Sequence, residues 1–118
     1  MKHMSFSLTT PQFRARTKRV TRRNGWLQAR VGDEVMGVEK GMGLKKGEKV
    51  VKLGAIRFAD VRREPLRRMT DDLDYGYREC VLEGFPALRP AQFVAMYCRH
   101  NLCTPDTLIT RVAFDYLD

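Results

Sequence analysis

The spacing of apolar residues changes from a period of two to a period near four and back along the chain. Alternation of apolar and polar positions, typical of β-strands, predicts strands over 5–8, 35–38, 50–65 and 108–117. Between the first two strands, Thr10 as an N-cap and Pro11 at the first helical position predict a short helix over 11–16. Pro65 is expected to end the long third strand, and Gly54 is a candidate bulge within it.

Two longer helices are predicted before the last strand. In the first, Leu73, Tyr77 and Val81 recur at helical spacing after a cap at Thr70 or Asp71, and Gly84 is the expected terminating glycine. The second helix covers 90–100 and collects these side chains on one face: Phe93, Val94, Tyr97 and Cys98.

Strands at both ends of the chain, two helices inserted before the last strand, and no βαβ repeat indicate an α+β fold around a small, strongly bent sheet. A length of 118 residues with 43% apolar content suits one compact domain, placed at 5–117. Residues 1–4 are interpreted as a tag remnant or a disordered start. In the last strand, the bulkier face of Val112, Phe114 and Tyr116 is expected to face the core and pack across the chain start.

Positive charge is concentrated near the start of the chain. The net charge is +8, and the first 32 residues contain eight Lys and Arg but no acid, so the whole surplus lies in this quarter. Six of these bases fall in the stretch "RARTKRVTRR" over 14–23. Because phosphates are attracted by a local density of Lys and Arg, the predicted partners are RNA, single-stranded nucleic acid or a modified nucleoside. A solvated face that maintains solubility is the plainer interpretation.

Several residues are candidates for contacting such a partner. Trp26 could stack on a base or pack in the core. Lys40 could reach a phosphate from the mouth of a glycine- and lysine-rich loop over 41–49, or form a surface ion pair with Glu39. The complete predicted binding set is Arg16, Arg19, Arg22, Arg23, Trp26, Lys40, Lys45 and Lys46.

Lys18 and Thr21 form a candidate catalytic pair. A threonine hydroxyl is a weak nucleophile unless a base removes its proton, and lysine can do so only when burial or nearby cations depress its pKa. Residues three apart point to opposite faces of a regular strand, so the two side chains can converge only at a bend or a helix end. A solvated edge, with Glu83 simply neutralising an arginine, is the alternative interpretation.

The sequence resembles the ASCH domain family, a small β-barrel family similar to the PUA fold. The resemblance covers roughly residues 5–117 and rests on "TKRVTRR", "GD", "EPL" and "EGFP" followed by "FV". Its most specific elements are Lys18-x-x-Thr21-x-Arg23 and Glu83-Gly84-Phe85.

The resemblance implies nucleic-acid or nucleotide binding in a basic cleft beside the first helix, with one branch acting as amidohydrolases on N4-acetylated cytidine and another acting on RNA. In the amidohydrolase branch the catalytic set is a lysine and a threonine from a Gly-x-Lys-Thr-x-Thr motif and a downstream glutamate. These positions match Lys18, Thr21 and Glu83. Arg16 stands in place of the motif's glycine, and Arg19 in place of its first threonine.

No metal or other cofactor is expected. Cys98, His100 and Cys103 are close in sequence, but no second ligand pair accompanies them, and the cysteines are interpreted as reduced thiols. No apolar run approaches the ~20 residues needed to cross a bilayer. A cytoplasmic monomer is therefore expected. Whether the chain binds nucleic acid or hydrolyses a nucleoside stays open, and so does the identity of the base.

Overall fold

The computed structural model describes all residues 1–118 and contains five strands and four helices. In chain order these are β1 (His3–Ser5), α1 (Thr10–Arg14), β2 (Val20–Arg23), β3 (Glu34–Val38), β4 (Lys52–Pro65), α2 (Arg68–Asp71), α3 (Leu73–Glu83), α4 (Pro90–Asn101) and β5 (Leu108–Tyr116). The α+β class is confirmed. None of the helices combines the length and apolar character that spanning a membrane requires.

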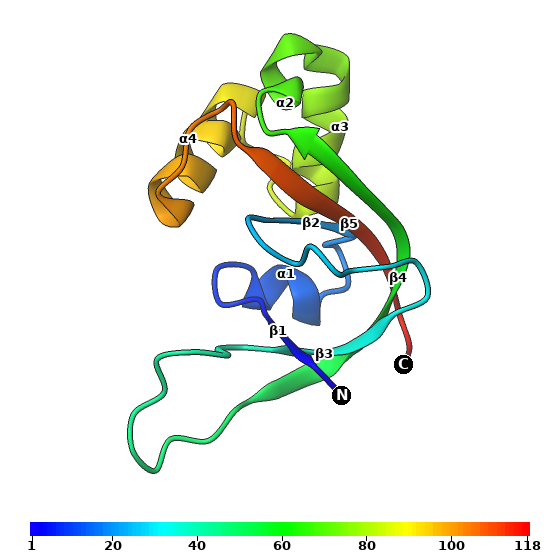
Figure 1. Cartoon of the computed structure of the whole chain (residues 1–118), viewed down its shortest axis with the longest axis vertical. Helices are drawn as coiled ribbons and strands as arrows, with labels where there is room; N and C mark the ends of the chain where they lie inside the picture. The colour runs from blue at the N-terminus through cyan, green and yellow to red at the C-terminus, as the bar shows by residue number, and fades with distance from the viewer.

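The five strands form one mixed sheet in the order β1-β3-β4-β5-β2. β1 runs parallel to β3, and the other neighbours are antiparallel. The long strands β4 and β5 curve strongly, with a register shift between Phe58 and Asp60, and α1 lies inside the curve (Figure 1). The expected closed barrel is wrong, because β1 and β2 remain at opposite edges of the sheet and the chain through α1 occupies the space between them.

The start of the chain differs from the expectation. The first strand begins at His3 and ends at Ser5, and Met4 is completely buried. Met4 and Phe6 share the inward face, so the alternation that predicted a strand over 5–8 starts two residues earlier. The interpretation of residues 1–4 as a disordered start is therefore corrected for His3 and Met4, which belong to the sheet.

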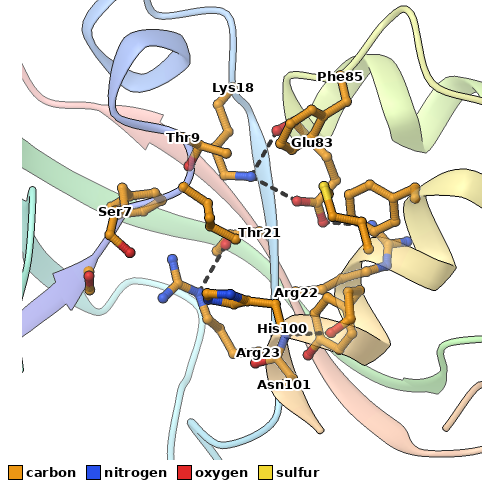
Figure 2. A pocket seen from close by; sticks show the side chains of 16 residues that line it. Ser7, Thr9, Lys18, Thr21, Arg22, Arg23, Glu83, Phe85, His100 and Asn101 are labelled. Atoms are coloured by element: carbon orange, nitrogen blue, oxygen red, sulfur yellow. Dashed lines mark hydrogen bonds and ion pairs between the residues drawn. The ribbon is translucent and has the colours of Figure 1, made fainter. Parts of the chain in front are cut away.

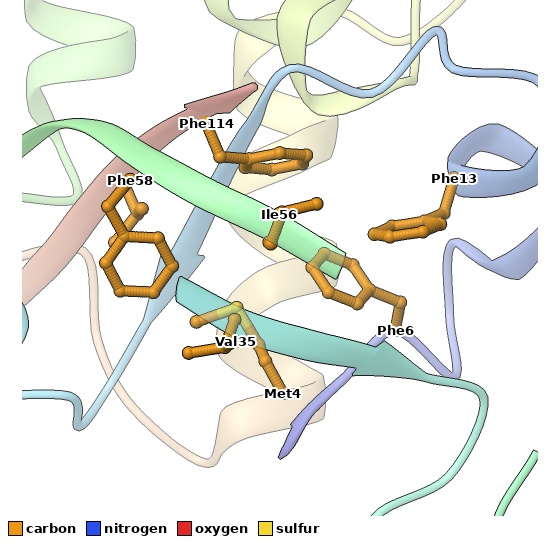
Figure 3. Packing of buried hydrophobic residues seen from close by; sticks show 8 residues of the cluster. Met4, Phe6, Phe13, Val35, Ile56, Phe58 and Phe114 are labelled. Atoms are coloured by element: carbon orange, nitrogen blue, oxygen red, sulfur yellow. The ribbon is translucent and has the colours of Figure 1, made fainter. Parts of the chain in front are cut away.

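One apolar core fills the concave side of the sheet. Its buried members are Met4, Phe6, Phe13, Val35, Ile56, Phe58, Val112 and Phe114 (Figure 3). The Phe6 ring lies 4.6 Å from that of Phe13 and 5.9 Å from that of Phe114, which confirms that Phe114 packs across the chain start. Gly37 makes room for α1, because a Cβ atom at this position would lie 2.5 Å from the Phe13 ring.

A second apolar core lies between the helices and the far end of β4 and β5. It contains Leu66, Met69, Tyr75, Cys80, Phe93, Val94, Tyr97 and Ile109. The predicted inward face of α4 is confirmed for Phe93, Val94 and Tyr97, which are buried.

Helix α3 presents the opposite face from the one predicted. Leu73, Tyr77 and Val81 are each more than half exposed, at 56%, 51% and 53%. The buried face instead carries Glu79 and Glu83, beside Tyr75, Gly76 and Cys80. The prediction of the helix and of Gly84 at its end is confirmed. The predicted buried face is wrong, because Glu79 and Glu83 turn toward the sheet to pair with Arg22.

Replacing Phe114 with alanine should lower the free energy of unfolding by about 3–5 kcal/mol, because it removes a ring that is 2% exposed and leaves a cavity among aromatic neighbours. Denaturant unfolding measures this change. Leu108→Ala on the same strand is the matched control, since Leu108 is 55% exposed and should cost little. Equal stabilities of the two variants would contradict the packing described here.

Candidate functional site

The segment between α1 and β2 brings Lys18 to the end of α3. Arg16 turns the chain with a positive φ of 63°, and the next residues, 17–19, form no regular element. The Arg19 amide donates a hydrogen bond to the Leu82 carbonyl at 2.7 Å, which joins the segment to the last turn of the helix. Lys18 and Thr21 therefore lie on either side of the point where the strand begins, at the kind of bend that the sequence required.

The C-terminus of α3 is shaped to receive the Lys18 amine. Gly84 ends the helix in the left-handed conformation with a φ of 95°. The Lys18 Nζ donates to the Glu83 carbonyl oxygen at 2.8 Å and to Glu83 Oε1 at 2.7 Å. Both side chains are almost fully buried, at 3% and 4% exposed.

Glu83 also belongs to a larger group of buried charges, here called the buried charge network: Lys18, Arg22, Glu79, Glu83 and Arg111. Arg22 donates to Glu83 Oε2 at 2.9 Å and to Glu79 Oε1 at 2.6 Å. Arg111 on β5 donates to both oxygens of Glu79, at 2.5 and 3.0 Å. The network thus joins α3 to β2 and β5.

The network shifts the pKa values of its members in opposite directions. Burial alone would raise the pKa of Glu79, but the hydrogen bonds from Arg111 and the charge of Arg22 hold it below its ordinary value. Burial alone would lower the pKa of Arg22, but Glu83 and Glu79 raise it. Lys18 behaves differently, because burial lowers its pKa and Glu83 only partly offsets this effect. Lys18 is therefore the only cation of the network whose pKa lies below its ordinary value, since those of Arg22 and Arg111 are raised.

Thr21 and Arg23 lie together on β2. The Thr21 side chain is nearly buried, and its hydroxyl accepts a hydrogen bond from Arg23 Nε at 3.0 Å. Burial lowers the pKa of Arg23 to about 10. The Arg23 guanidinium also lies over the Phe6 ring, 4.9 Å from its centre.

A pocket of about 200 Å³ adjoins the buried charge network, whose members Glu79 and Arg111 lie outside its wall. Lys18, Thr21, Arg23 and Glu83 line it from the side of β2 and the end of α3 (Figure 2). Most of the remaining lining residues come from the β1–α1 segment and from α4, with Ser7, Thr9, Tyr97, His100 and Asn101 among them. All three residues of the predicted catalytic set, Lys18, Thr21 and Glu83, thus line the same pocket.

Most of the predicted binding residues lie elsewhere. Of that set, only Arg22 and Arg23 line the pocket, and Arg22 is already held by carboxylates of the buried charge network. Trp26 packs against Phe58, with ring centres 6.1 Å apart, beside the first core. The other five are dispersed: Arg16 is bound to Asp118, Arg19 lies near Asp115, Lys40 lies near Glu48, and Lys45 and Lys46 are exposed on the loop that projects from β3 and β4. The predicted continuous basic cleft is therefore replaced by a small pocket.

Sequence reasoning missed Glu79 and Arg111, which complete the network. Glu79 and Glu83 are four residues apart and must share one helical face, which was the available signal. It was overlooked because an apolar stripe at the same spacing lay on the opposite side of the helix.

No protein-family model matches this sequence, and no curated protein matches it. Among solved structures, the chain is similar to the crystal structure of protein EF3133 from Enterococcus faecalis V583, whose family model is DUF984, with a TM-score of 0.55 and 15% sequence identity. The match covers 95% of this chain and 68% of that one. At this identity the likeness concerns the fold alone.

Glu79→Gln should destabilise the protein by about 3–5 kcal/mol at neutral pH, because it leaves two buried guanidinium groups without their shared partner. Glu48→Gln, on the exposed loop, is the control. The pKa of Glu79 is lowered by folding, so its contribution is complete above its ordinary pKa of 4.5 and is lost as the pH falls through the lower folded value. The stability difference between wild type and Glu79→Gln should therefore shrink in acid, and a pH-independent difference would contradict this role.

Proposed function

We propose that the pocket is the active site of a small amidohydrolase that acts on an acylated nucleoside of the N4-acetylcytidine type. The observation that carries this proposal is that Lys18, Thr21 and Glu83 line one pocket, with Lys18 bonded to Glu83 and the Thr21 hydroxyl bonded to Arg23. The substrate class comes from the resemblance to the ASCH domain family. A volume of about 200 Å³ lies below the ~300–1,000 Å³ typical of drug-sized ligands, so one small molecule suits it better than a polymer.

The reaction would use the three side chains in sequence. Neutral Lys18 takes the proton of the Thr21 hydroxyl while the threonine oxygen attacks the acyl carbon. The carbon–nitrogen bond then breaks, and the Lys18 ammonium returns a proton to the leaving nitrogen. Water, deprotonated in its turn by Lys18, then attacks the acyl carbon of the threonine ester. The bond from this carbon to the Thr21 oxygen breaks, the Lys18 ammonium returns the proton to that oxygen, and the carboxylic acid is released. Glu83 holds the lysine in position through both steps.

The environment of each residue supports its assigned role. Burial lowers the pKa of Lys18, which increases the fraction of neutral amine available as a base. Arg23 donates to the Thr21 oxygen, a contact that becomes stronger as that oxygen loses its proton. Thr21 remains on the pocket wall, where a carbonyl group can approach it.

The two departures from the family motif do not disturb this arrangement. Arg16 adopts the positive φ for which a glycine is favoured, and it is held there by its hydrogen bond to the Phe13 carbonyl and by Asp118. Arg19 points away from the pocket toward Asp115, so its replacement of a threonine removes no hydroxyl from the site.

Thr21→Ala and Lys18→Met should each reduce hydrolysis of N4-acetylcytidine by about 100-fold or more, and the double variant should lose no more than the worse single one, because the residues act as a unit. Chromatography of the released cytidine measures the rate. Thr17→Ala, an exposed hydroxyl of the same segment, is the control. The wild-type rate should rise with pH until Lys18 is neutral, below its ordinary pKa of 10.5. Full activity of Thr21→Ala would overturn the mechanism.

The basic surplus of the chain favours a second candidate, the binding of RNA or single-stranded nucleic acid with one nucleotide in the pocket. Exposed bases such as Lys45 and Lys46 would then contact the backbone.

In that case the affinity for a short RNA, measured by fluorescence anisotropy, should fall with salt at a slope of about 0.7 per neutralised phosphate. Changing Arg19, Lys45 and Lys46 to glutamine should flatten this slope, whereas Thr21→Ala should leave binding nearly intact. An affinity that is independent of salt would eliminate this candidate.

A further inference from the structure

Arg23 differs from every other lysine or arginine that is buried or half-buried. All the others have a carboxylate within ion-pair distance: Arg16, Lys18, Arg22, Arg62, Arg68 and Arg111. Arg23 has none, although it is flanked by the buried charge network. Arg23 is partly buried, and its terminal nitrogens are not among the fully buried polar atoms, so an anion that enters the pocket can reach them.

The Arg23 side chain is fixed in place by contacts that leave its donors free. Its Nε is bonded to Thr21 Oγ1 at 3.0 Å, and its planar group lies against Phe6. The two terminal nitrogens make no hydrogen bond to the protein and lie at the pocket (Figure 2). Across the same space stand the side chains of Ser7 and Thr9.

The charge balance of the pocket is positive. Glu83 is the only acid on its wall, and both of its carboxylate oxygens are already engaged, one by Lys18 and the other by Arg22. Although burial lowers the pKa of Arg23 to about 10, the side chain remains a cation at neutral pH. An anionic ligand would therefore meet one uncompensated positive charge, presented by a preorganised fork of two donors.

We propose that Arg23 binds a phosphate group of the ligand, so that the pocket takes a nucleotide in preference to a free nucleoside. The nucleoside part of this ligand rests on the proposed function, while the phosphate rests on Arg23. A guanidinium binds two phosphate oxygens through parallel hydrogen bonds, a geometry that lysine cannot reproduce. The phosphate is either the terminal group of a mononucleotide or a linkage within an oligonucleotide, and the two sources share this chemistry.

The test compares the binding of cytidine, cytidine 5′-monophosphate and a cytidine-containing dinucleotide to the intact protein by calorimetry. None of these ligands carries an acyl group, so binding is measured without turnover. At least one phosphate-bearing ligand should bind about tenfold more tightly than cytidine or better, the range expected for charge-assisted hydrogen bonds. Tighter binding of the monophosphate identifies a terminal phosphate, and tighter binding of the dinucleotide identifies a linkage.

Arg23→Gln should remove this preference, Arg23→Lys should keep part of it, and Arg78→Gln should keep all of it. Arg78 is the matched control because it is exposed and has no ion-pair partner, so the same charge is removed away from the pocket. Thermal unfolding of Arg23→Gln should stay close to wild type, since no carboxylate loses its partner. Should that variant fail to fold, Arg23→Lys gives the comparison.

Two results would overturn the proposal: equal binding of cytidine and both phosphate-bearing ligands, or a preference that survives Arg23→Gln. If binding is equal but Arg23→Gln slows hydrolysis of N4-acetylcytidine, Arg23 acts on the acyl group and the amidohydrolase assignment stands alone. If no acylated nucleoside is hydrolysed but Arg23→Gln abolishes a phosphate preference, the hydrolase assignment fails and the phosphate subsite stands.

Discussion

The structure depends on the requirement that every charge buried between α3 and the sheet has a partner of opposite sign. The hydrophobic effect has no preferred direction, whereas a buried carboxylate displaced from its guanidinium is strongly unfavourable. Glu79 between Arg22 and Arg111 therefore specifies one position of the helix against β2 and β5. The two apolar cores stabilise that arrangement from either side, and the ion pairs select it.

The pocket follows from the same arrangement and from the alternation of a β-strand. Successive side chains on β2 point to opposite faces, so Arg22 reaches the acids of α3 while Thr21 and Arg23 remain together on the other side. The bend at Arg16 lets Lys18 meet the same acid from the segment before the strand. The short segment 18–23 therefore attaches α3 to the sheet through Lys18 and Arg22, and it also forms one wall of the pocket.

Local patterns were enough to predict most elements, and the family resemblance was needed to place Glu83, which lines the pocket, beside Lys18 and Thr21. Local patterns failed where long-range pairing decides the outcome. The buried face of α3 was predicted wrongly because Leu73, Tyr77 and Val81 have the spacing of a core-facing stripe although they are exposed. The local sequence also does not show that Glu79 and Glu83 pair with Arg22 and Arg111, which lie far away in the chain. Closure of the sheet also depends on strand pairing between distant segments, and the parallel match of β1 with β3 was not encoded in either strand alone. The dispersal of the basic residues has the same origin, since Arg16 and Arg19 pair with Asp118 and Asp115 near the far end of the chain.

The double use of Glu83 affects how variation in this protein can be interpreted. Its side chain holds Arg22 in the fold and Lys18 in the pocket, so selection for a folded chain is sufficient to retain it whether or not any reaction occurs. Thr21 and Arg23 are bonded to each other and have no ion-pair partner in the protein. Among related sequences, the retention of Thr21 and Arg23 would therefore indicate a ligand more directly than the retention of Glu83, which folding alone explains.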